Sequence, residues 1–131
     1  ASYLANHLRA SAEKHGLSVQ VNQIGSLMCP YFAENPVKCY ADAKKSDTKQ
    51  YAAYFNGMLK RGIYLAPSQF EAMFVSSVHT QNDLACTVQA AEETFAEMAE
   101  RAGGVYARIL HYRRRNGNER HADSGSSPRA R

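Results

Sequence analysis

The chain has 131 residues, of which 44% are hydrophobic and 21% are charged, a balance typical of one soluble globular domain. No apolar run approaches the ~20 residues that a helix needs to cross a bilayer, so we expect no transmembrane segment. The net charge of +4 is unevenly placed: residues 1–100 carry 8 Lys or Arg and 10 Asp or Glu, and residues 101–131 carry 8 Arg and 2 acidic residues. Any nucleic-acid contact is therefore expected in the basic tail, because the remainder is net acidic.

The start of the chain and its cysteines indicate the setting of the protein. Ala1 opens inside a helical pattern, with neither a start methionine nor the apolar core of a signal peptide, so we expect a longer natural chain. Three scattered cysteines without CxxC spacing argue against a disulfide framework or a zinc site: Cys29, Cys39 and Cys86. Such cysteines fit a reducing compartment, and the expected location is the cytoplasm, or the plastid stroma in a plant or alga.

The first elements are expected to be a helix followed by a hairpin. Residues 2–15 place apolar side chains at helical spacing, and Gly16 suits the left-handed position that follows a helix. Residues 17–24 alternate apolar and polar side chains like a half-buried strand, and residues 27–32 read as its partner. Because Pro30 cannot donate to a ladder, we expect this second strand at a sheet edge or with a bulge.

The middle of the chain predicts a second helix and two short strands. Residues 47–61 carry apolar side chains along one helical face, and Asp47 or Ser46 is suited to cap this helix. Residues 63–66 and 73–78 are apolar runs on either side of a Pro-Ser turn, so each is expected to be a strand.

The last predicted helix covers residues 81–101. Thr80 and Asp83 form a capping-box-like start, and Gly103-Gly104 are expected to end the helix. From Gly104 onward the chain is basic and rich in Gly, Ser and Pro, which predicts a disordered tail over residues 104–131 with at most a short helical piece at its start. Residues 1–103 are then one α+β domain, a small antiparallel sheet packed by helices on one side.

The turn between the two short strands is the best candidate for a functional site. A strand stops at Pro67-Ser68, the turn presents the carboxylate of Glu71, and the chain then returns as a strand. Turns at the end of a sheet are where sites are often displayed. Between Phe70 and Phe74 this carboxylate would be partly desolvated, whereas the alternative is an ordinary exposed turn glutamate.

No other residues assemble a catalytic or metal site by their spacing. His79 is expected to be a structural histidine that bonds nearby backbone, and Cys29 a small buried residue without a paired base. His7 and His15 are eight residues apart on one helix, too far for one metal, and read as solvated polar positions.

Three runs of the sequence resemble a known enzyme family. They are DAKKSDT at 42–48, LAPSQFEA at 65–72 and SVHTQND at 77–83. Over residues 1–101 the chain is similar to the glutamate-1-semialdehyde 2,1-aminomutases, which belong to the class III branch of the fold-type I pyridoxal-phosphate enzymes. The LAPSQFEA run is specific within that branch.

The resemblance implies the C-terminal domain of an enzyme that isomerises glutamate-1-semialdehyde to 5-aminolevulinate, the precursor of haem and chlorophyll. It places Glu71 and Ser68 at the substrate pocket, where Glu71 would shape and gate the pocket without transferring protons. It places the Schiff-base lysine and the other groups that bind pyridoxal 5'-phosphate in a large domain before residue 1, and implies a homodimer. No catalytic, cofactor-binding or metal-ligating residue is then expected here, and the chain alone would be inactive.

Departures from the family pattern leave alternatives open. Lys44 and Lys45 lie in a polar loop and cannot stand in for the Schiff-base lysine, and Met73 replaces a common glycine after the Glu-Ala pair. The alternatives are the C-terminal domain of another class III aminotransferase, or a small module that binds nucleic acid through its arginine tail. A further possibility is a poorly folding chain that exposes the apolar stripe of residues 51, 55 and 59.

Overall fold

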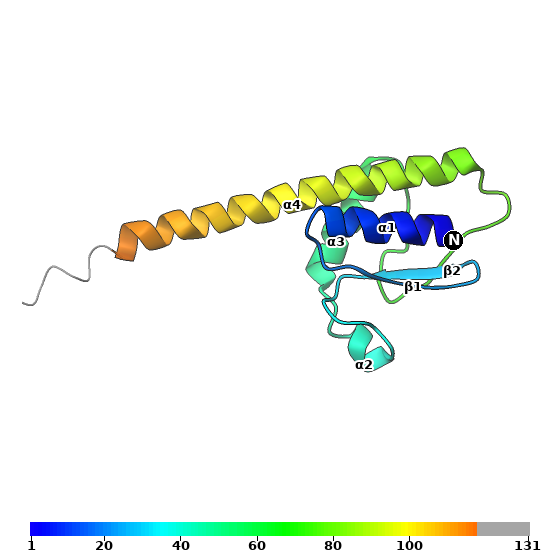
Figure 1. Ribbon diagram of the computed structural model, residues 1–131, viewed down its shortest axis with the longest axis horizontal. Helices are drawn as coiled ribbons and strands as arrows, with labels where there is room; N and C mark the ends of the chain where they lie inside the picture. The colour runs from blue at the N-terminus through cyan, green and yellow to red at the C-terminus, as the bar shows by residue number, and fades with distance from the viewer. Residues whose placement is uncertain (118–131) are drawn as a thin grey trace, which may run out of the picture. The chain divides into compact units, whose positions relative to one another are not determined.

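The computed structural model describes the backbone of residues 1–117 and the side chains of residues 1–104. The helices are α1 (Ser2–Lys14), α2 (Tyr40–Ala43), α3 (Thr48–Lys60) and α4 (Gln81–Gly117), and the strands are β1 (Gln20–Ile24), β2 (Leu27–Tyr31) and β3 (Met73–Phe74) (Figure 1). The chain divides into the unit Ala1–Ala99 and the unit Glu100–Arg131, and every strand of residues 1–117 lies in the first. The predicted α+β class is confirmed.

The sheet is antiparallel, in the order β1-β2-β3. The predicted hairpin is confirmed, with Ile24 opposite Leu27 and Gly25 at a φ of 55° in the turn. The expected edge position of β2 is wrong, because β2 is the central strand, and its register to β1 runs without a bulge. Pro30 is tolerated because β3 pairs only with Leu27 and Met28, so at Pro30 the ladder is one-sided.

Two predicted strands are shorter or absent. Residues 63–66 have no regular secondary structure and pair with no strand of the described chain, so that prediction is wrong. Their alternation arises because Ile63 and Leu65 pack against the core while Tyr64 points outward. The strand expected over 73–78 is reduced to β3, and the short helix α2 was not predicted.

The helix starts agree with the sequence, whereas one helix end does not. The Asp47 carboxylate accepts hydrogen bonds from the backbone N–H of Lys49 (2.9 Å) and Gln50 (3.0 Å), as the first residues of α3 require. At α4 the backbone N–H of Thr80 donates to Asp83 Oδ2 (2.7 Å), and the N–H of Asp83 donates back to Thr80 Oγ1 (3.1 Å).

The predicted end of the last helix at Gly103-Gly104 is wrong, since α4 continues to Gly117. Glycine lowers helix propensity by about 1 kcal/mol but does not block the helical hydrogen bonds, and no proline follows within α4. The division into a domain of residues 1–103 and a basic tail stays a prediction. The disorder expected for the tail lies, from residue 118 onward, outside the described residues.

The core fills the space between the sheet, α1, α3 and the first part of α4. In Figure 1, α1 and the start of α4 lie on the same side of the sheet. An aromatic cluster forms its centre, in which Phe95 stacks on Tyr54 with ring centroids 5.2 Å apart and Phe32 meets both rings. The exposure considered for the apolar stripe on α3 is wrong for two of its three residues. Tyr51 is buried in this cluster and Phe55 is half-buried, whereas Leu59 is exposed.

Glu92 on α4 fastens α1 to α4. Its carboxylate accepts hydrogen bonds from Ser11 and Lys14, and His15 Nε2 lies 2.9 Å from it. These hydrogen bonds lower the pKa of Glu92 from 4.5 to about 2, and the bond from Lys14 has the largest effect. His15 is therefore not the solvated position that the sequence predicted, since it reaches across to α4.

The Glu92 contact is expected to weaken in acid. A carboxyl whose folded pKa is lowered contributes stability above its unfolded pKa and loses that contribution as the pH falls toward the folded value. The melting temperature of the native chain should therefore exceed that of Glu92→Gln above pH 5, and the difference should shrink between pH 4.5 and pH 2. The control is Glu13→Gln, at an exposed position of α1. A difference that stays constant down to pH 2 would contradict this role of Glu92.

Candidate functional site

The turn at residues 67–72 is held to the core at three points. The Tyr51 hydroxyl donates to the carbonyl of Ala66 (2.6 Å), immediately before the turn. The Cys29 thiol donates to the carbonyl of Gln69 (3.1 Å), and the side-chain Oε1 of Gln69 accepts from the backbone N–H of Phe32 (3.4 Å). Because these anchors come from β2, from the residue after it and from α3, the position of the turn is set by the packed core and not by the turn alone.

Burial keeps the anchoring groups neutral. Desolvation raises the pKa of the Cys29 thiol, so the group remains a hydrogen-bond donor and not a thiolate nucleophile. Desolvation also raises the pKa of Tyr51 to about 12, helped by the negative charge that Cys29 acquires only at high pH and by the carboxylate of Glu71. The prediction that Cys29 is a small buried residue is confirmed.

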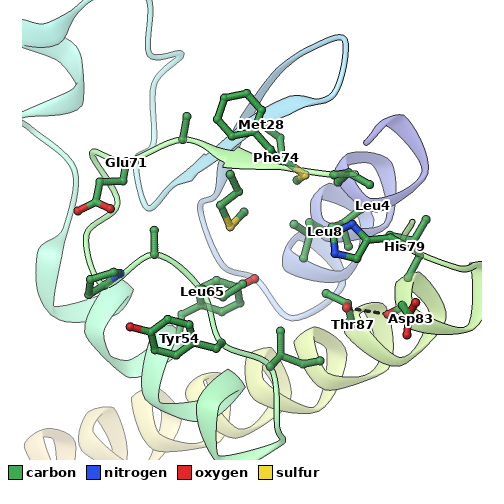
Figure 2. Close-up of a pocket in the computed structure, with 18 residues that line it drawn as sticks. Leu4, Leu8, Met28, Tyr54, Leu65, Glu71, Phe74, His79, Asp83 and Thr87 are labelled. Carbon is green, nitrogen blue, oxygen red and sulfur yellow. Dashed lines mark hydrogen bonds between the residues drawn. The ribbon is translucent and has the colours of Figure 1, made fainter. Parts of the chain in front are cut away.

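A cleft of about 470 Å³ opens between this turn and the starts of α1 and α4. Its walls come from α1, β2, α3, residues 63–67, residues 71–75 and the first turns of α4 (Figure 2). Figure 2 shows Glu71 at one end of the cleft and His79 with Asp83 at the other. The lining is mainly apolar with a few polar groups, which is the usual composition of a small-molecule site.

The polar groups at the α4 end of the cleft are already engaged. The backbone N–H of Ser76 donates to His79 Nδ1 (2.9 Å), which confirms the predicted backbone-bonded histidine and leaves the proton of the neutral ring on Nε2. Asp83 is committed to the cap of α4, and its hydrogen bonds with Thr80 lower its pKa. Thr87 Oγ1 donates to the carbonyl of Asp83 (2.8 Å).

Glu71 is the candidate residue that the structure places in the cleft wall. It is exposed, and within residues 1–104 no hydrogen bond engages its carboxylate, so the group is available to a ligand. Ser68 does not line the cleft. Its Oγ accepts from the backbone N–H of Phe70 (3.2 Å) and its carbonyl accepts from that of Glu71 (3.2 Å), so Ser68 shapes the turn that carries Glu71.

The cleft does not by itself fit a phosphate-bearing cofactor. None of its lining residues is Lys or Arg, so neither a phosphate group nor a Schiff base finds a basic partner there. Lys44 and Lys45 are exposed on the far loop, and Lys44 Nζ lies over the ring of Tyr40, 5.7 Å from its centre. In the described part of the chain, no group of three or more His, Cys, Asp or Glu side chains could hold a metal ion.

The sequence did not reveal the anchoring role of Gln69. Its side chain is only 2% exposed, whereas glutamine is ordinarily a surface residue. The one signal was its place between the serine and the phenylalanine of the LAPSQFEA run. No helix within the described residues combines the length and apolar character that crossing a membrane requires.

Comparisons with known proteins give close relatives for most of the described chain, although no family model matches it. The glutamate-1-semialdehyde 2,1-aminomutase of Ruminiclostridium cellulolyticum is 53% identical over 97 residues, which are 74% of this chain and 22% of the relative. The enzyme of the same name from Natranaerobius thermophilus is 45% identical over 98 residues, 75% of this chain and 23% of the relative.

A solved structure supports the same class. The crystal structure of a β-phenylalanine aminotransferase from Variovorax paradoxus matches with a TM-score of 0.61 and 27% identity, over 69% of this chain and 20% of that one. The fold is therefore that of the C-terminal part of an aminotransferase-type enzyme. Within that class, the chain is similar to the C-terminal part of the glutamate-1-semialdehyde 2,1-aminomutases, and it spans about a fifth of the length of the curated relatives it matches.

Proposed function

We propose that this chain supplies one wall of the substrate pocket of an enzyme that isomerises glutamate-1-semialdehyde to 5-aminolevulinate. The main support is the match at 45–53% identity to relatives that carry this name. Glu71, which stands unbonded in the wall of an apolar cleft, is the residue that we propose to contact the substrate. The remainder of such an enzyme would carry the catalytic lysine and would pair as a homodimer in the cytoplasm.

The chemistry is divided between a cofactor and the residues of this chain. Pyridoxal 5'-phosphate, when bound, supplies the electron sink for moving the amino group. The role of this chain is to close one side of the pocket with apolar side chains and to position the carboxylate of Glu71 in the pocket wall. A carboxylate there attracts the amino group of a substrate or intermediate and repels a carboxylate, so Glu71 disfavours substrates that would place a carboxyl group at that end of the pocket.

The isolated 131-residue chain is expected to form no lysine-linked cofactor. All its described lysines are exposed, and the cleft contains none. Incubation with pyridoxal phosphate and borohydride, followed by mass spectrometry of peptides, checks this. The positive control is a chimera in which the matched 97 residues of this chain replace the corresponding stretch of the R. cellulolyticum enzyme. Site-specific labelling of one lysine in the isolated chain would contradict the proposed division of labour.

Glu71→Gln in this chimera is expected to raise KM about tenfold, which corresponds to 1.4 kcal/mol of binding, with a smaller change in kcat. The reason is that the amide keeps the shape of the carboxylate but loses its charge. Steady-state assays of 5-aminolevulinate formation measure both constants. Glu34→Gln, at an exposed position outside the cleft lining, is the matched control. If Glu71→Gln and the control behave alike, Glu71 does not contact the substrate.

A second candidate is another aminotransferase of the same class, favoured by the likeness to the β-phenylalanine aminotransferase. That likeness is at 27% identity, well below the identity to the aminomutases, and it supports the class more than the substrate. Comparing amino-group transfer to an added keto acid with isomerisation, in an enzyme that carries this segment in its natural chain, separates the two.

A further inference from the structure

One apolar pattern runs along α4 from its first turns almost to its end. Apolar residues recur at alternating spacings of four and three residues, at Leu84, Val88, Ala91, Phe95, Met98, Ala102, Val105, Ile109 and Tyr112. This spacing places them along one face of the helix, as in the seam of a coiled coil. We call this face the α4 seam.

The core covers only the first part of the α4 seam. Ala91 and Phe95 are each 1% exposed, Met98 is half-buried, and Ala102 is exposed. The seam positions that follow lie in the unit Glu100–Arg131, where the structure describes no helix or strand other than the end of α4 itself up to residue 117. A partner for this part of the seam therefore has to come from outside that described element.

The positions beside the end of the seam are basic. Residues 101–117 contain five Arg and no Asp or Glu. In the heptad that the seam defines, Arg108 and Arg115 take g positions and Arg113 takes an e position. Residues at e and g flank the apolar seam and set the choice of partner through their charges. The complementary surface is therefore an apolar stripe flanked by carboxylates.

The same charges disfavour a second copy of this chain as the partner. Two parallel copies would place Arg108 opposite Arg113, and two antiparallel copies would place g arginines opposite each other. Residues 81–100 of α4 are acidic, but in a second copy they are not available either. Their apolar face is buried in the core, and Glu93 and Glu97 are bonded to Arg61 at 3.0 Å and 3.1 Å.

Arg113 also favours a protein partner over a membrane. At about 100° per residue, Arg113 falls between Ile109 and Tyr106 around the helix, which is within the apolar face. A charge at that place opposes insertion of the face into a bilayer, whereas at an e position it can pair with a partner's glutamate. Nucleic acid would attract the arginines but would give the apolar seam nothing to pack against.

We propose that residues 101–117 of α4 bind an acidic amphipathic helix of a partner protein. The seam positions Val105, Ile109 and Tyr112 would meet the apolar stripe of the partner, and the flanking arginines would meet its carboxylates. This goes beyond the proposed function, because the resemblance to the aminomutases extends over residues 1–101 and the matches cover 74–75% of this chain.

The test titrates the 131-residue chain with a synthetic peptide of about three heptads that carries leucine at a and d and glutamate at e and g. Calorimetry is expected to show binding, and Arg108→Glu with Arg115→Glu should weaken it at least about tenfold, because both flanking contacts become repulsive. The matched control is Lys38→Glu with Lys49→Glu, which makes the same change of net charge at exposed positions of the first unit and should leave binding nearly unchanged.

A second pair of variants tests the apolar part of the contact. Val105→Ser with Ile109→Ser keeps every charge and should also weaken binding about tenfold. A peptide of the same composition, with its leucines moved away from the a and d positions, should not bind. Absence of binding by the first peptide would overturn the proposal. Equal binding of the two peptides, or equal effects of the arginine and lysine pairs, would do so too, because net charge alone would then explain the attraction.

Two further measurements identify a different occupant. A dimer of the chain alone in sedimentation, which Val105→Ser with Ile109→Ser dissociates, would reject the acidic partner in favour of a second copy. Displacement of the peptide by vesicles that contain phosphatidylserine would reject it in favour of a membrane surface. None of these measurements depends on enzymatic activity, so each outcome is independent of the proposed function.

Discussion

Gly57→Ala is expected to lower the free energy of unfolding by about 1–3 kcal/mol, the usual cost of forcing an extra group into a well-packed core. Gly57 lies in α3 where that helix meets α4. A Cβ atom there would stand 2.4 Å from Cγ2 of Thr94, a distance that real Cβ atoms essentially never show. Thr94 cannot easily turn away, because it is buried and its hydroxyl donates to the carbonyl of Ala90 (2.7 Å). Urea unfolding followed by circular dichroism measures the loss.

Two companion variants show whether the contact between the helices is the cause. Thr94→Ser removes Cγ2 but keeps the hydroxyl, so Gly57→Ala with Thr94→Ser should recover much of the loss. Gly104→Ala adds the same methyl in α4, where no atom lies within 4 Å of the new Cβ, and should stabilise that helix by up to about 1 kcal/mol. A Gly57→Ala loss that Thr94→Ser does not reduce would mean that the close approach is not responsible.

Features that depend on neighbouring residues in the sequence could be predicted, and features that depend on distant ones could not. The caps at Asp47 and at Thr80 with Asp83 follow from side chains within three residues of the backbone groups that they satisfy. The close approach of Gly57 to Thr94 depends on which helices meet, so a glycine inside α3 gave no sign of it.

Residues 63–66 illustrate the same limit for strands. Alternating apolar side chains predict that one face of an extended segment is buried, and this holds, since Ile63 and Leu65 pack against the core. A strand also needs a partner, and alternation carries no information about pairing. Pro30 shows the same limit. A sheet edge or a bulge is expected there, because the sequence does not show that β3 pairs only with Leu27 and Met28 and leaves Pro30 without a partner on that side.

In the candidate site, too, the local features could be predicted from the sequence and the long-range contacts could not. The turn and its carboxylate Glu71 were visible in the sequence, because proline and serine interrupt the apolar pattern and a charge follows them. The groups that fix the turn were not visible, since Cys29 and Tyr51 are 40 and 15 residues away from their partners Gln69 and Ala66. What positions Glu71 is therefore a property of the fold and not of the LAPSQFEA run alone.

Gln69→Leu is expected to lower the free energy of unfolding by about 1–3 kcal/mol, because the variant leaves a buried donor without its acceptor. The donor is the backbone N–H of Phe32, which bonds Oε1 of Gln69 in the native chain. Leucine keeps nearly the same volume, so the loss does not report a cavity, and because leucine also removes the buried Nε2 of Gln69, which has no partner among the described residues, the loss is a lower bound for the hydrogen bond. The turn should also loosen, and in the chimera kcat/KM should fall because Glu71 is then less well placed. Chemical unfolding and steady-state assays measure the two effects.

Ser68→Ala separates an anchor in the core from a bond within the turn. It removes the hydroxyl that accepts from Phe70, but this bond lies at the exposed surface and joins residues only two apart. Water can replace it, so the expected loss of stability is below about 0.5 kcal/mol. The backbone amide of Phe32 should exchange faster in Gln69→Leu and at the native rate in Ser68→Ala. Equal exchange of Phe32 in the two variants would show that Gln69 is not the anchor, and the position of Glu71 would then depend on Cys29 and Tyr51 alone.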